Sequence, residues 1–222
     1  MTGNRWVRAA GLAALAVLLC LSGMLLRPFI IPDSQSAPPV LNPTEIGFTQ
    51  DMMAHHEQAL IIVQRLDPAA DPTIRQLAQQ ISDTQRIEIG TMLGWLRLAN
   101  ASPTDPHPMS WMRSTGMSGG TDHSAMSMPT TTAPAAGAAM PGMATLAELD
   151  ALSAARGSAA ETLFLQLMLR HHRGGVAMAR AADKQVTSGP VKETARSMIT
   201  AQSQEAGIMT LLLAQRGAQP LA

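Results

Sequence analysis

Two pairs of adjacent histidines offer the clearest chemistry in this sequence: His55 and His56, and His171 and His172. A methionine lies three residues before each pair, at Met52 and at Met168. Because residues three apart share one face of a helix, we expect each methionine to lie beside a histidine. An imidazole nitrogen next to a thioether sulfur is a ligand set for a soft or borderline metal ion. The sequence therefore predicts copper binding, with Cu(I) favoured and Ag(I) or Cu(II) as alternatives.

The two histidine pairs belong to an internal repeat. Residues 48–56 match residues 164–172 at Phe, Gln, Met, His and His, with a constant offset of 116. With an offset of 117, a second set of residues matches its counterparts: Ala78, Gln85, Glu88, Gly90, Met92 and Leu96 correspond to Ala195, Gln202, Glu205, Gly207, Met209 and Leu213. This repeat indicates that one helical hairpin occurs twice.

Helical phase predicts that one histidine of each pair faces the interior. The spacing of four and three residues that marks a bundle seam runs through Phe48, Met52, His55, Ala59 and Ile62, and it recurs in the second copy. We expect inward-facing residues of the partner helices to hydrogen-bond His55 and His171 and so to fix which imidazole nitrogen is free. These residues are Gln85, Glu88, Gln202 and Glu205. His56 and His172 lie about 100° further round and are assigned to a second ion or to the surface.

The predicted metal ligands come from both hairpins: Met52, His55, His56, Met92, Met168, His171, His172 and Met209. A packing role is the alternative, because methionine on a helix seam commonly fills the core. In that alternative the buried His, Glu and Gln side chains only specify packing in a structural or protein-interaction module. A di-iron redox enzyme is disfavoured, because its Glu-x-x-His motif does not occur in the sequence. We predict no enzymatic activity.

The N-terminal segment predicts export. Residues 9–26 are apolar and follow Arg5 and Arg8, as in a signal peptide or a membrane anchor. No A-x-A cleavage site follows closely, which favours a retained anchor within residues 1–30 with the remainder facing outward. Cleavage would give a secreted or periplasmic protein. One cysteine, Cys20, against 16 methionines suits an oxidising compartment, where a thiolate is readily lost and a thioether is not.

Charge limits the expected partners. Lys and Arg number 16 and so do Asp and Glu, and no basic run interleaves with aromatics, so nucleic acid is excluded as a partner. The low charged fraction, 14%, favours self-association into a homo-oligomer. The predicted partners are therefore a metal ion, other copies of the chain, and a membrane if the N-terminal segment is retained.

Proline and capping signals divide the rest of the chain into segments. An extended tether is expected at residues 31–42 and a first hairpin at 43–100. Residues 145–217 are expected to hold a short helix and the second hairpin. We expect helices over residues 43–66, 72–99, 145–156, 158–183 and 190–216. Residues 101–144 are rich in Pro, Gly, Ser, Thr and Met, which is typical of a flexible linker. Accessory low-affinity ligands are expected there: His107, Met109, Met112, Met117, His123, Met126 and Met128.

The double motif resembles one protein family. F-x-x-x-M-x-x-H-H followed by Q-x-x-E-x-x-x-M, present twice between residues 45 and 213, is similar to the family known as domain of unknown function 305. The resemblance implies an all-α, ferritin-like four-helix bundle of two repeated hairpins, exported in bacteria, with copper binding in some members. Residues 141–145 also resemble the second half of longer members. The sequence departs mildly from the family in the run Arg173-Gly174-Gly175, where a Gln or Glu followed by Gly-Ala is more usual.

Overall fold

The computed structural model describes residues 3–30, 39–113 and 140–221, and in these ranges it contains seven helices and no strand. The predicted all-α class is therefore confirmed. The chain divides into two units, residues 1–39 with helix α1 (Gly3–Ile30) and residues 40–222 with the other helices. Of the predicted tether, residues 31–38 lie outside the described residues and residues 39–42 are described.

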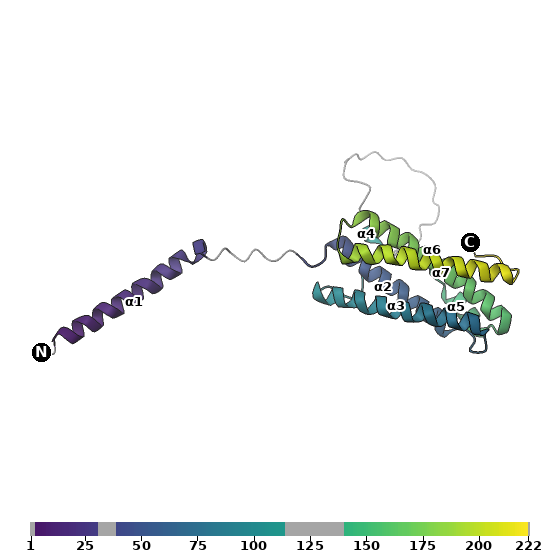
Figure 1. Cartoon of the computed structure of the whole chain (residues 1–222), viewed down its shortest axis with the longest axis horizontal. Coiled ribbons are helices and arrows are strands. Elements are labelled where there is room, and N and C mark those ends of the chain that lie inside the picture. The colour runs from purple at the N-terminus through teal and green to yellow at the C-terminus, as the bar shows by residue number, and fades with distance from the viewer. Residues whose placement is uncertain (1–2, 31–38, 114–139, 222) are drawn as a thin grey trace, which may run out of the picture. The chain divides into compact units, whose positions relative to one another are not determined.

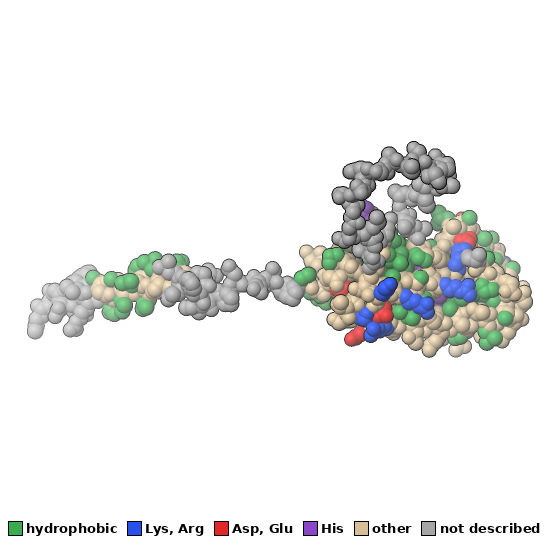
Figure 2. Space-filling model, turned by 90° about the horizontal axis from the view of Figure 1, so that it is seen from above, with side chains coloured by type: hydrophobic (Ala, Val, Ile, Leu, Met, Phe, Trp, Pro, Cys, Tyr) green, Lys and Arg blue, Asp and Glu red, His purple; other side chains and the backbone are tan. Residues whose placement is uncertain are grey.

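Helix α1 carries apolar side chains along its described surface (Figure 2), among them Leu12, Leu18 and Met24, and Cys20 is exposed as well. Of the helices that the structure describes, none combines the length and the apolar character that crossing a membrane requires. The membrane anchor predicted from the sequence is therefore not supported.

The first hairpin consists of α2 (Pro43–Gln64) and α3 (Pro72–Leu98), and both helices begin at the predicted prolines. Asn42 and Glu45 form a capping box at the start of α2, in which each side chain accepts a hydrogen bond from the other's backbone N–H. Asp71 caps α3. These caps satisfy backbone N–H groups that a helix start leaves free, which is why local sequence locates both helices well.

The second hairpin consists of α6 (Gly157–Gln185) and α7 (Pro190–Gln215), preceded by the short helix α5 (Leu146–Ala154). Thr145 and Glu148 form the capping box of α5. Helix α2 packs against α3 and α6, and α6 packs against α7 and α5. Figure 1 shows α2, α3, α6 and α7 running alongside one another.

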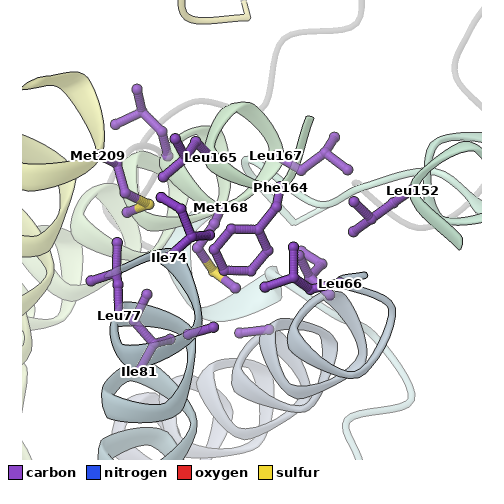
Figure 3. Close-up of a cluster of buried hydrophobic side chains, with 14 of the residues drawn as sticks. Leu66, Ile74, Leu77, Ile81, Leu152, Phe164, Leu165, Leu167, Met168 and Met209 are labelled. Atoms are coloured by element: carbon purple, nitrogen blue, oxygen red, sulfur yellow. The ribbon is translucent and has the colours of Figure 1, made fainter. Parts of the chain in front are cut away.

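Two separate hydrophobic cores fill this unit. We call the first the aliphatic core, and Figure 3 shows part of it, including Ile74, Ile81, Leu152, Phe164, Met168 and Met209. Ile62, Leu213 and Leu149 of α5 also belong to it. We call the second the thioether core, because six buried methionines take part in it: Met52, Met53, Met92, Met109, Met178 and Met198.

Part of the predicted linker belongs to the folded unit. Helix α4 (Ser110–Arg113) packs on α2, and Met109 and Trp111 are buried in the thioether core. The carboxylate of Asp51 on α2 accepts hydrogen bonds from the Met109 backbone N–H at 2.7 Å and from Trp111 Nε1 at 2.8 Å. Gly47 leaves room for the Trp111 ring, since a Cβ there would lie 3.0 Å from Trp111 Cδ1. The prediction of a flexible linker over residues 101–144 therefore does not hold for residues 109–113.

Candidate metal site

His55 of α2 and His171 of α6, here called the inner histidines, meet between the two cores. Their ring centroids are 3.8 Å apart with an interplanar angle of 32°, and both residues are buried. Along α2, His55 separates Met52 of the thioether core from Ile62 of the aliphatic core. Along α6 the order is reversed. Met168, which precedes His171, belongs to the aliphatic core, and Met178, which follows it, belongs to the thioether core. The repeat thus places its two equivalent histidines against each other.

The hydrogen bonds of the inner histidines fix their tautomers. His55 Nε2 lies 3.0 Å from the carbonyl oxygen of Pro141, and His171 Nε2 lies 2.9 Å from the carbonyl oxygen of His55. A carbonyl oxygen only accepts, so each Nε2 carries the proton and donates it. In the neutral ring Nδ1 then holds a lone pair. Neither Nδ1 has a hydrogen-bond partner among the described residues, although both are buried.

Both inner histidines are held neutral. Burial lowers the pKa of His55 to about 3, and the neighbouring His56 reinforces the shift. Burial also lowers the pKa of His171 well below its ordinary value, and repulsion from the other three histidines adds to the effect. The neutral imidazole is the form that binds metal ions, so the site needs no deprotonation near neutral pH.

His56 and His172, here called the outer histidines, are bonded to carboxylates. His56 Nε2 donates to Glu88 at 2.6 Å, and His172 Nε2 donates to Glu205 at 2.7 Å. The prediction that these glutamates bond the inner histidines is wrong. A rotation of about 100° per residue turns each outer histidine toward the partner helix of its own hairpin, whereas the inner ones face the other hairpin. Neither outer histidine reaches the surface, because both are fully buried.

The two predicted glutamine partners do not bond the histidines either. Gln85 Oε1 has no hydrogen-bond partner among the described residues, and neither does the side-chain amide of Gln202. Both side chains are nevertheless buried. Gln202 lies against α6 at Gly175, where a Cβ would come within 2.3 Å of its Oε1. These amides add unsatisfied polar atoms to the interior.

The predicted methionine ligands fall into two sets. Met52 and Met92 are fully buried in the thioether core, and Met168 and Met209 are fully buried in the aliphatic core. Each set combines one methionine from each helix of a hairpin, and the four do not gather in a single cluster. Within the described residues there is no group of three or more His, Cys, Asp or Glu side chains arranged to hold a metal ion.

Three of the accessory ligands predicted in the linker are described by the structure, and none of the three bonds the histidines. His107 is exposed, Met109 is buried in the thioether core, and Met112 packs at the edge of that core. The others lie outside the described residues: Met117, His123, Met126 and Met128.

A segment that sequence reasoning did not assign to the site covers the inner histidines. Residues 140–144, here called the strap, supply the Pro141 carbonyl that His55 bonds. The Gln58 side chain donates to the Ala144 carbonyl at 2.9 Å and accepts from the Ala144 N–H at 2.6 Å. One sequence signal could have pointed to the strap, namely the resemblance of residues 141–145 to the family. In the structure, Gly174 of α6 faces this segment.

Fold and site together define a class of protein. It is all-helical in the described residues, and it holds two adjacent neutral imidazoles between two cores that the repeat relates. The family described as "Domain of unknown function (DUF305)" matches residues 45–213 of the chain. The chain therefore belongs to this family. No protein with a curated description matches it.

Solved structures agree with this assignment. A protein of the family from Streptomyces coelicolor, described as secreted, is 36% identical, with a TM-score of 0.66 over 81% of this chain and 96% of that one. A fragment from Deinococcus radiodurans is 30% identical, with a TM-score of 0.61 over 80% and 99%. CopM in its Cu(I)-bound form is 22% identical, with a TM-score of 0.54 over 78% and 98%, and shows likeness of fold.

Proposed function

We propose that this chain is an exported, non-catalytic copper-binding protein that buffers copper in the cell envelope. The carrying observation is a set of four buried imidazoles, each with an Nδ1 atom that has no partner in the described residues, of which the inner two are also held neutral. A buried nitrogen lone pair without a partner is unfavourable in an apolar interior, and a bound metal ion removes that cost.

The choice of copper rests on the donor types. Imidazole and thioether suit Cu(I), and the four buried methionines at repeat-related positions supply soft donors that need no deprotonation. CopM, which shares the fold, has been described in Cu(I)-bound and Cu(II)-bound forms. Export is supported by the apolar N-terminal segment and by the Streptomyces coelicolor relative that is described as secreted. We also infer that the four long helices form a ferritin-like four-helix bundle of two hairpins.

The test is a competition titration of the full chain with Cu(I) and a chelator. We expect the His55→Ala/His171→Ala double variant to lose affinity by more than about 100-fold, because both imidazole ligands are gone. His107→Ala is the matched control, because it removes an exposed histidine that was predicted only as a low-affinity accessory ligand, so the tight-binding step should stay as in the parent. Thermal unfolding of each variant shows whether the fold persists. Equal binding by parent and double variant would refute the site.

A packing role is the second candidate, and one observation favours it. All four histidines already donate from Nε2 to an oxygen acceptor at 2.6–3.0 Å, which is how buried polar groups specify a unique arrangement of helices. In this alternative the double variant loses stability while the parent chain binds no copper tightly. The same titration therefore separates the two candidates.

A further inference from the structure

The inner histidines differ in how their tautomers are fixed. His171 donates to a backbone carbonyl within α2, the partner helix itself. His55 donates to Pro141, which lies on the strap between two helices and not on a helix. The tautomer of His171 therefore depends on helix packing, whereas that of His55 depends on where the strap runs.

Several contacts hold the strap in place over His55. Gln58, three residues further along α2, makes its two hydrogen bonds to the Ala144 backbone. Gly142 has a φ of 79°, and a Cβ at that position would lie 2.4 Å from the Arg170 carbonyl oxygen. The strap also lines an open cleft of about 580 Å³, together with Arg173 and Ala177 of α6.

Gly174 is the residue that admits the strap. A Cβ at this position would lie 1.9 Å from the Pro141 carbonyl oxygen, the same atom that accepts the His55 hydrogen bond. The contact is to backbone, so no side-chain rotation relieves it. Gly175, the next residue, is also buried, but a Cβ there would meet the end of the flexible Gln202 side chain. The two glycines thus form a matched pair, one facing the strap and one facing a side chain.

We propose that the strap sets the tautomer of His55, so that Nδ1 is the metal-binding atom, and that Gly174 is the positioning residue that makes this possible. With the Pro141 carbonyl in place, a proton on Nδ1 would leave that carbonyl and Nε2 facing each other as two acceptors. With the carbonyl displaced, the proton can move to Nδ1 and occupy the lone pair that binds the metal. The role of Nδ1 as a ligand rests on the proposed function; the control of the tautomer does not.

The experiment uses the full chain labelled with 15N-histidine. Long-range proton–nitrogen correlation spectra of the metal-free protein report which ring nitrogen is protonated, and single His→Gln variants assign the signals. Ag(I) then serves as a soft, redox-stable probe. We expect His55 and His171 to carry the proton on Nε2, and Ag(I) to shift their Nδ1 resonances.

Three variants test the role of the strap. Gly174→Ala should give His55 a mixed tautomer and lower Ag(I) affinity about tenfold, with the tautomer of His171 unchanged. Gly175→Ala should change neither tautomer. Gln58→Ala loosens the strap without adding atoms, so it should act in the same direction as Gly174→Ala and remains informative if that variant does not fold.

The outcomes are distinguishable. The inference is overturned if metal-free His55 carries its proton on Nδ1, if Ag(I) shifts Nε2, or if both strap variants leave the His55 tautomer as in the parent. If the tautomers are as expected and Ag(I) shifts no imidazole nitrogen, the proposed function fails and the ligand role of Nδ1 fails with it, while the control of the tautomer stands.

Discussion

The two cores are built from the same repeat but filled with different chemistry. Where the aliphatic core has Ile62 and Ile81, the thioether core has Met178 and Met198 at the repeat-related positions. At other repeat-related positions the residue is the same in both cores, as with Met52 and Met168 or Met92 and Met209. The difference separates two uses of methionine. Methionines present in both copies are the candidate ligands, and methionines present in only one copy fill space.

The largest effect expected from this comparison concerns repeat-related leucines. Leu96 of the thioether core and Leu213 of the aliphatic core are both fully buried. We expect Leu213→Ala to lower the free energy of unfolding by about 4–5 kcal/mol and Leu96→Ala by about 2–3 kcal/mol, because flexible methionines can move into the smaller cavity. Urea unfolding measures both. Equal costs, or a larger cost for Leu96→Ala, would contradict a more adaptable thioether core.

Acid should destabilise the layer between the cores. The folded-state pKa values of His55 and His171 lie below the ordinary value of 6.5, so the unfolded chain binds more protons in this range. Stability is therefore full above pH 6.5 and falls as the pH drops toward 3, by about 1 kcal/mol per pH unit for each inner histidine. Urea unfolding between pH 7.5 and pH 5 tests this. His55→Gln should reduce the slope, and a parent protein with constant stability over this range would refute the prediction.

The segments that cover the two cores should differ in sensitivity. Asp51→Ala leaves two buried donors at Met109 and Trp111 without an acceptor and should cost about 2 kcal/mol. Asp150→Ala removes the ion pair between α5 and Arg65 over the aliphatic core; the Asp150 side chain is 76% exposed, so the expected cost is below about 0.5 kcal/mol. Unfolding free energies and tryptophan fluorescence report both. A larger cost for Asp150→Ala would reverse the comparison.

The last comparison gives one core the residues of the other, and its main expected effect is on copper affinity. Met178→Ile with Met198→Ile should cost below about 1.5 kcal/mol per site and leave copper affinity unchanged, because these methionines only fill space. Met52→Leu with Met168→Leu should have a similar cost but should lower Cu(I) affinity. Competition titrations of both double variants decide the matter. A loss of Cu(I) affinity in the Met178→Ile/Met198→Ile variant would contradict the assignment of these two methionines as residues that only fill space.

Local signals account for what the sequence predicted well. Asn42, Asp71 and Thr145 cap helices that begin where expected, because capping depends on residues a few positions apart. The repeat likewise predicted that His55 and His171 would be interior residues. These features are readable because their partners are close in sequence or duplicated.

Contacts between distant segments were not predictable in the same way. The Pro141 carbonyl that bonds His55 is 86 residues away, and its position depends on how closely the strap can approach Gly174. Composition also misassigned Trp111, because a Pro-rich and Ser-rich neighbourhood says nothing about a buried acceptor such as Asp51 on another element. Glu88 was assigned to the wrong histidine of the pair because phase alone does not say which helix each face meets.

The described segments on either side of residues 114–139 contact the same helix. The segment before them bonds Gln50 and Asp51 of α2, and the strap after them bonds His55 and Gln58, about 6 to 12 Å further along α2. The two flanking segments are therefore held at nearby points of the folded unit. A flexible connection between nearby points is insensitive to length, because doubling its length costs only about 0.6 kcal/mol of closure entropy. We therefore expect that a longer flexible linker or a reporter domain can replace residues 114–139 while the histidine layer stays intact.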